Sequence, residues 1–155
     1  MQALPDDPID TVRTRARELF DSKKHNCAEA VFLAVNDVLS GGLEPGTAAR
    51  IATGLGGGLG ATGGTCGALT GGVLAIGLIA GSGPDASRRA TIYPLAAALQ
   101  ERFKKRFGSC ICKQLTHGIT CDRRVHCSPI TAGAAAMCAE ILLDSRNRSL
   151  STHKP

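Results

Sequence analysis

Apolar residues recur at intervals of three and four along most of the chain, a pattern that predicts amphipathic helices. The clearest case follows Asn26, a good N-cap residue with Glu29 three positions later, as in a capping box. Apolar positions then continue at helical spacing to Leu39, and the pair Gly41 and Gly42 ends the helix. This places Cys27 at the first helical position, beside free backbone N–H groups.

The same reasoning predicts five further helices. Asp10 is a candidate N-cap for the first, and Ser128 followed by Pro129 is a strong start signal for the last. No segment alternates apolar and polar residues as a strand would. The further helices are expected at 11–20, 45–53, 66–79, 85–107 and 129–143.

These elements predict an all-α fold, a compact bundle of about five to six helices, in one domain over residues 1–144. The cysteine motifs occupy 26–143. The polar residues 145–155 are expected to form a disordered tail.

Residues 54–72 form the predicted centre of the bundle, because ten of these nineteen residues are glycine. Such a segment loses much backbone entropy on ordering, so its glycines indicate a close approach of the backbone to a helix or a bound group. Cys66 lies at the end of this turn, where the next helix begins. Free N–H groups and the helix dipole there favour the thiolate. The glycines proposed to contact a cofactor are Gly58, Gly60, Gly64 and Gly67.

The chain contains seven cysteines, and its first ten residues carry no apolar segment typical of a secretory signal. We therefore expect a cytoplasmic protein, in which clustered cysteines bind metals or react with oxidants more often than they form structural disulfides. The odd number also argues against a fully paired disulfide framework.

Two groups of cysteines could carry chemistry. Cys27, Cys66 and Cys127 are each predicted at or just before a helix start, and four such thiolates commonly hold an iron–sulfur cluster. Cys138 lies on an apolar face and is interpreted as core. No Cys-x-x-Cys-His occurs, which excludes covalent c-type haem. The second group, whose spacing is not the usual one for zinc, contains Cys110, Cys112, Cys121 and Cys127.

Other signals are weaker. His25 and His126 stand close to Cys27 and Cys127 and are candidate ligands or proton carriers. Residues 58–63 fit the dinucleotide-binding pattern, but the strand that should precede that pattern is missing.

The net charge is +5, with a basic run at 102–106 and the pair Arg123 and Arg124. No aromatic residues alternate with these charges to stack on bases, so we expect solvated helix faces and no nucleic acid. Residues 51–83 are uncharged, but their continuous apolar run, 73–80, is far shorter than the ~20 residues of a membrane span. A small-residue helix face at Gly67, Gly71 and Ala75 would suit a homodimer.

Several of these motifs, taken in order, resemble the C_GCAxxG_C_C family, for which a redox role has been suggested. The matching segments are 26–31 (Asn-Cys-Ala-Glu-Ala-Val), 54–60, 66–71 (Cys-Gly-Ala-Leu-Thr-Gly), 107–109 with Cys112 soon after, and Cys127. The resemblance implies a small helical fold with Cys27, Cys66, Cys112 and Cys127 as the family cysteines. The chain departs from the pattern in having Thr65 before Cys66 and in three extra cysteines, Cys110, Cys121 and Cys138. Of these, Cys110 and Cys121 could act as alternative ligands or resolving thiols.

The leading hypothesis is therefore a redox protein whose four family cysteines bind a metal, with an iron–sulfur cluster as first choice, for electron transfer with an unidentified partner. A second is a cluster-free thiol–disulfide protein in which Cys66 or Cys27 attacks. A third is a protein-interaction module held together by zinc at the C-terminal cysteines. Whether the protein is an enzyme stays open.

Overall fold

The computed structural model describes residues 7–83 and 85–152, and every regular element in this part is a helix. The only β-type pairing there is a single antiparallel bridge between Thr65 and Ile111. The predicted all-α class is confirmed. The elements are α1 (Pro8–Asp21), α2 (Cys27–Val38), α3 (Pro45–Ala52), the 3-10 turn η1 (Thr53–Leu55), α4 (Gly67–Ala80), α5 (Arg88–Phe107), α6 (Cys112–Leu115) and α7 (Arg123–Ser151).

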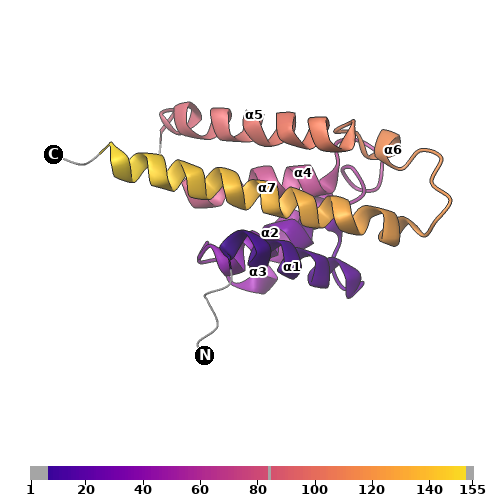
Figure 1. The fold of residues 1–155 in the computed structure, drawn as a ribbon. Coiled ribbons are helices and arrows are strands. Elements are labelled where there is room, and N and C mark those ends of the chain that lie inside the picture. Colours follow the sequence, from indigo (N-terminus) through magenta and orange to yellow (C-terminus); the bar gives the residue numbers. More distant parts are fainter. Residues whose placement is uncertain (1–6, 84, 153–155) are drawn as a thin grey trace.

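The long helix α7 runs along the bundle and packs against α1, α2, α4 and α5 (Figure 1). Helices α2 and α4 approach closely at Gly71 because glycine has no side chain. A Cβ on Gly71 would lie 2.6 Å from the Ala28 carbonyl oxygen. Larger side chains such as Phe103 and Leu99 are fully buried between α5 and its neighbours. Helix α6 and the first turns of α7 lie at the same end of the molecule, opposite the C-terminus (Figure 1).

The predicted start of α2 is confirmed in detail. The Asn26 side chain accepts a hydrogen bond from the Glu29 N–H (2.9 Å), and the Glu29 carboxylate accepts one from the Asn26 N–H (3.1 Å). Asn26 also donates to the Thr53 carbonyl (2.9 Å), which ties this cap to η1. Cys27 is the first residue of α2, as expected.

The predicted bounds of α1 are wrong at the N-terminus. Asp7, not Asp10, is the N-cap, and its carboxylate accepts a hydrogen bond from the Ile9 N–H (3.0 Å). Pro8 occupies the first turn, where its missing N–H removes no helical hydrogen bond.

The predicted start of the last helix is also wrong. Helix α7 begins at Arg123 with Asp122 as its N-cap, so Pro129 lies inside the helix and Cys127 in its second turn. An interior proline costs about 3 kcal/mol. Contacts of the first turn act against this cost, because Arg124 stacks 4.7 Å from the Phe20 ring centroid and donates to the Phe20 carbonyl.

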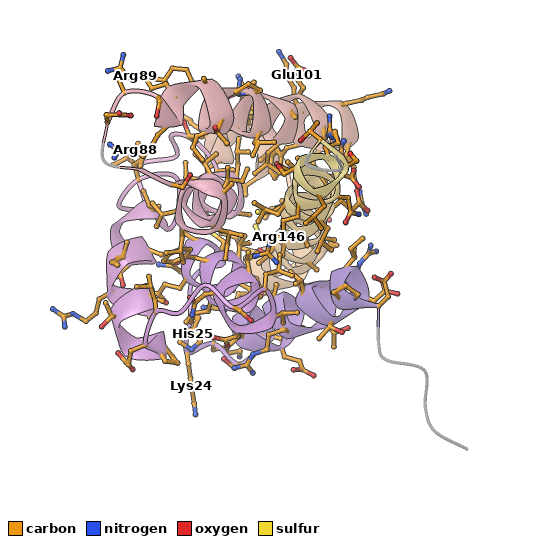
Figure 2. All side chains as sticks on the ribbon, turned by 90° about the vertical axis from the view of Figure 1, so that its left-hand side faces the viewer. Lys24, His25, Arg88, Arg89, Glu101 and Arg146 are labelled. Atoms are coloured by element: carbon orange, nitrogen blue, oxygen red, sulfur yellow. The ribbon has the colours of Figure 1, made fainter. Side chains whose placement is uncertain are left out.

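Helix α7 also continues to Ser151, so residues 145–151 are helical and not a disordered tail. No glycine or proline interrupts this segment, and Arg146, labelled in Figure 2, donates to the Leu39 carbonyl (3.2 Å). Residues 153–155 of the predicted tail lie outside the described part. The short helix α6 was not predicted.

Most charged side chains project outward, as Lys24, Arg88, Arg89 and Glu101 do in Figure 2. Within the described residues, α7 alone is long and apolar enough to cross a membrane, and 72% of its apolar window is buried inside the protein. Burial of this extent is what the core helix of a bundle shows, so the helix is weak evidence for a span.

Candidate functional site: a cavity lined by four cysteines

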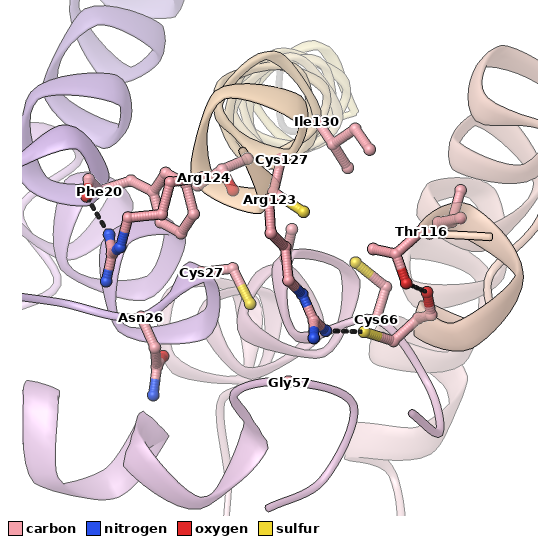
Figure 3. Close-up of a pocket in the computed structure, with 14 residues that line it drawn as sticks. Phe20, Asn26, Cys27, Gly57, Cys66, Thr116, Arg123, Arg124, Cys127 and Ile130 are labelled. Atoms are coloured by element: carbon pink, nitrogen blue, oxygen red, sulfur yellow. Dashed lines mark hydrogen bonds between the residues drawn. The ribbon is translucent and has the colours of Figure 1, made fainter. Parts of the chain in front are cut away.

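Cys27, Cys66, Cys112 and Cys127 all line one cavity of about 220 Å³. Each comes from a different element: the first residue of α2, the N-cap of α4, the first residue of α6 and the second turn of α7. Figure 3 shows Cys27, Cys66 and Cys127 around the side chain of Arg123. Elements distant in sequence thus bring the four cysteines of the resemblance together.

The glycine turn allows two of these cysteines to approach the backbone. A Cβ on Gly67 would lie 2.5 Å from the Cys27 sulfur. A Cβ on Gly58, whose φ is +74°, would lie 2.7 Å from the Cys112 Cβ. Gly60 has open space around it, and Gly64 acts through its carbonyl, which accepts a hydrogen bond from Cys112. A contact of these four glycines with a cofactor stays a prediction.

A short antiparallel clip joins the glycine turn to the start of α6. The Cys66 N–H donates to the Cys110 carbonyl (2.8 Å), and the Cys112 N–H donates to the Gly64 carbonyl (2.7 Å). The Thr65–Ile111 bridge lies between these two bonds. Backbone hydrogen bonds therefore fix Cys66 and Cys112 relative to each other.

Burial decides the protonation of Cys66. Burial first, with repulsion from Cys27 and Cys112 added to it, raises the pKa of this thiol from 9.0 to about 12. The Ala68 and Leu69 N–H groups at the start of α4 lower the pKa, as the sequence predicted, but they do not outweigh burial. The expectation of a thiolate at Cys66 is therefore wrong for the protein without a bound cation.

The pKa of Cys127 is raised as well, first by burial and then by Cys27 and Cys112, while the nearby Arg123 guanidinium lowers it. Cys66 and Cys127 are thus each close enough to Cys27 and Cys112 to be repelled by their charged forms. Cys66 and Cys127 therefore resist ionisation unless a positive group enters the cavity.

Arg123 is the positive side chain nearest the sulfurs. Its Nη2 donates to the Cys112 sulfur at 3.0 Å. Arg124, also on the cavity wall, stacks on the Phe20 ring and donates to the His25 carbonyl (3.4 Å). Only one of the two arginines therefore directs its charge at the sulfurs.

The three additional cysteines lie elsewhere. Cys121 is exposed, and Cys110 is partly buried with its sulfur 3.8 Å from the Gln100 carbonyl. Cys138 is fully buried and donates to the Gly72 carbonyl (3.4 Å), which confirms its interpretation as core. The structure does not bring Cys110 or Cys121 to the cavity, so the C-terminal zinc grouping is not assembled.

His25 and His126 do not line the cavity. His25 Nδ1 lies 3.4 Å from the Glu29 carboxylate, and His126 Nε2 lies 2.7 Å from the Leu115 carbonyl. Sequence reasoning missed Arg123 and Thr131 as cavity residues. Each lies four residues from Cys127, and residues at this spacing share one face of a helix. The spacing indicates a shared face only once α7 is known to begin at Arg123.

Within residues 7–83 and 85–152, no group of three or more His, Cys, Asp or Glu side chains is gathered closely enough to hold a metal ion. The four cysteines therefore share a cavity without forming a ready-made site for a single ion.

The fold and the cavity define a small helical protein with four buried or half-buried thiols facing a shared space. The profile of the family described as "Putative redox-active protein (C_GCAxxG_C_C)" matches residues 25–141. The chain belongs to this family, whose name states a redox activity. Comparisons with curated proteins and with solved structures found no significant match.

Proposed function

We propose that the protein is an electron-transfer protein whose cysteines Cys27, Cys66, Cys112 and Cys127 hold an iron–sulfur cluster. The observation that carries the proposal is their convergence on one cavity, from four elements, while the other three cysteines stay outside. The family description supports the redox character.

The arrangement of the sulfurs favours a cluster over one ion. A tetrahedral zinc site requires every sulfur at about 2.3 Å from a common centre. In a [4Fe–4S] cluster each thiolate binds its own iron, so the ligands need not meet at one point. Sulfurs spaced around a cavity of about 220 Å³ fit the second requirement better.

The surroundings supply what such a group needs. A bound cluster would provide a one-electron redox couple. Burial raises the pKa of Cys66 and Cys127 and so keeps both thiols protonated when no metal is bound. The cationic irons of a cluster would replace these protons. Apolar neighbours such as Ile130 and Leu115 limit water at the sulfurs, and Arg123 offsets part of the negative charge of four thiolates.

Anaerobic purification followed by iron, sulfide and absorbance analysis tests the proposal. The expected protein is brown, contains iron and acid-labile sulfide, and gives an electron paramagnetic resonance signal on reduction with dithionite. Serine at any one cavity cysteine should remove most of the iron, whereas Cys121→Ser, which changes an exposed cysteine, should not. Colourless, iron-free protein after anaerobic reconstitution with iron and sulfide would reject the cluster.

The closeness of Cys66 and Cys127 to the other two cavity thiols also supports a second function, thiol–disulfide exchange. Two thiols would form one disulfide and pass two electrons and two protons to a disulfide substrate. Attack falls to Cys27, which is partly exposed, because Cys66 is protonated at neutral pH. Thiol counting before and after oxidised glutathione distinguishes this function: a loss of two thiols from iron-free protein would support it.

A further inference from the structure

A second concave site lies where three helices meet. Figure 1 shows α7 between α1 and α5, and it packs against both. A groove of about 450 Å³ is found at this junction, a volume within the range of small-molecule sites. None of its residues lines the cysteine cavity. The groove is lined by Arg13 of α1, by Arg102, Lys105 and Arg106 of α5, and by Ala136, Met137 and Glu140 of α7.

The groove carries an excess of positive charge. Four of its seven lining residues are cationic, and Glu140 is the one carboxylate among them. Glu140 lies 3.6 Å from Arg102 Nη1, so it offsets one charge and leaves three. Within residues 7–83 and 85–152, no salt bridge joins Lys105 or Arg106 to a carboxylate. Like charges gathered in one groove repel one another, and a bound anion would remove this cost.

The basic run at 102–106, which we expected to form a solvated helix face, supplies three of these cations. Its fourth cation, Lys104, does not line the groove. Arg13 completes the set from α1, a contribution that spacing along the chain does not reveal. The fold therefore assembles a cationic site from two helices that are distant in sequence.

Arg106 is positioned over α7 by its own contacts. Its Cζ lies 5.3 Å from the Phe107 ring centroid, a cation–π distance. A Cβ on Gly133 would lie 3.5 Å from the same carbon, so the guanidinium rests against the α7 backbone where no side chain intervenes. A group fixed in this way loses less conformational entropy when a ligand binds.

Arg102 and Arg13 are each next to a carboxylate but remain accessible. Arg102 pairs with Glu140, and Arg13 Nε lies 3.6 Å from Asp10, which is outside the groove. The side chains of Arg102 and Arg13 are 46% and 39% exposed, so both are open to a ligand. Exposed pairs of this kind are weak, so a stronger anion can compete for the guanidinium groups.

We propose that this groove binds a small organic anion that carries two phosphate groups. Guanidinium forks match the geometry of phosphate oxygens and donate paired hydrogen bonds to them. Each phosphate monoester carries about 1.5 to 2 negative charges at pH 7, so two groups match the excess of three better than one does. Ala136 and Met137 offer an apolar surface for the carbon part of the ligand. The groove contains no cysteine, so this binding does not depend on the proposed function.

Isothermal titration calorimetry of the full-length protein tests the proposal with two probes, pyrophosphate and orthophosphate. At about 0.15 M salt, pyrophosphate should bind at one saturable site. Its affinity should exceed that of orthophosphate by about tenfold or more, because a single phosphate leaves part of the charge unmatched. Pyrophosphate that does not bind, or binds no better than orthophosphate, would overturn the proposal.

Matched variants distinguish a built site from the general attraction of a basic protein. Lys105→Gln and Arg106→Gln should each weaken pyrophosphate binding about tenfold or more, the change expected for a lost hydrogen bond to a charged group. Lys104→Gln on α5 and Arg17→Gln on α1 remove the same charge outside the groove. Both should change the affinity by less than about twofold, because salt screens exposed charges. Equal weakening by these controls would overturn the site.

Glu140→Gln should have the opposite effect. The variant keeps the shape of the side chain but removes the one carboxylate of the groove and frees Arg102. Pyrophosphate should then bind about twofold to fivefold more tightly, the range that an exposed ion pair spans. A gain in affinity cannot come from a damaged fold. Unchanged or weaker binding by Glu140→Gln would overturn the proposal, and iron content, which this experiment does not measure, has no part in the outcome.

Discussion

Cys66 and Cys138 lie in two regions of the molecule that surround a buried thiol differently. The pKa of both thiols is raised to about 12, with burial as the largest cause. Around Cys138 the packing of α4 and α7 is continuous, and burial is the whole cause of its shift. Around Cys66 there are N–H donors from α4, two other sulfurs and an open cavity. Burial alone therefore does not mark a site. A site is marked by burial together with hydrogen-bond donors, neighbouring thiols and an open cavity.

Replacing each of the two thiols by a hydroxyl tests this comparison with the largest expected effect. Cys66→Ser should reduce bound iron to roughly a tenth or less of the wild-type content, because a ligand is lost. Cys138→Ser should keep the full iron content, since serine can still donate to the Gly72 carbonyl. Iron analysis after anaerobic reconstitution measures both. Equal losses in the two variants would show that the regions do not differ in function.

The glycines of the two regions give the next largest effect. A Cβ on Gly67 meets the Cys27 sulfur at 2.5 Å and the Leu55 carbonyl at 2.9 Å, so Gly67→Ala should displace the ligand and weaken iron retention about tenfold. A Cβ on Gly72 meets the Leu99 side-chain tip at 2.7 Å. Gly72→Ala should therefore cost about 1–3 kcal/mol of stability through overpacking and leave retention unchanged. Chelator release and urea unfolding of both variants check this pair.

The pH dependence of stability separates the regions in the iron-free protein. Both thiols have a folded pKa above the unfolded value of 9.0, so each contributes stability that is present below pH 9 and is lost as the pH rises toward 12. Cys138→Ser removes one of these groups. The stability difference between wild type and this variant should therefore shrink from pH 8 to pH 11 in urea unfolding. A difference that stays constant would contradict the raised pKa.

The smallest effect concerns two N-caps of the same kind. Asn26→Ala and Asp7→Ala should each cost about 1 kcal/mol, the usual loss for a cap. Asn26 precedes Cys27 and also holds the Thr53 carbonyl (2.9 Å), whereas Asp7 caps α1 and does not line the cavity. Only Asn26→Ala should therefore speed iron release. Thermal melting measures the shared loss, and chelator kinetics measure the difference.

Local signals predicted most of the fold. The Asn26 and Glu29 capping box and the end of α2 before Gly41 and Gly42 each depend on residues within a few positions of one another. They held because the local preference and the packing agree. At Pro129 they disagree. The helix begins at Arg123 instead of at the serine and proline start signal, and Arg124 in its first turn makes contacts with Phe20 that no local pattern contains.

That one error hid part of the candidate site. With the helix expected to begin at Pro129, Arg123 lay in a loop, and its spacing from Cys127 and Thr131 carried no meaning. The protonation of Cys66 was misread for a related reason: the helix start is visible in the sequence, but burial depends on distant elements. The convergence of the four cysteines could be expected only from the family resemblance.

The clip between the glycine turn and α6 has a consequence for assembly. Cys66 and Cys112 are separated by 46 positions in the chain, yet backbone pairing across Thr65 and Ile111 holds them as one rigid unit. Half of the sulfur set is thus preorganised as soon as the chain folds. If the proposed cluster binds here, it would need to immobilise only the side chains of Cys27 and Cys127, which would lower the entropic cost of its binding.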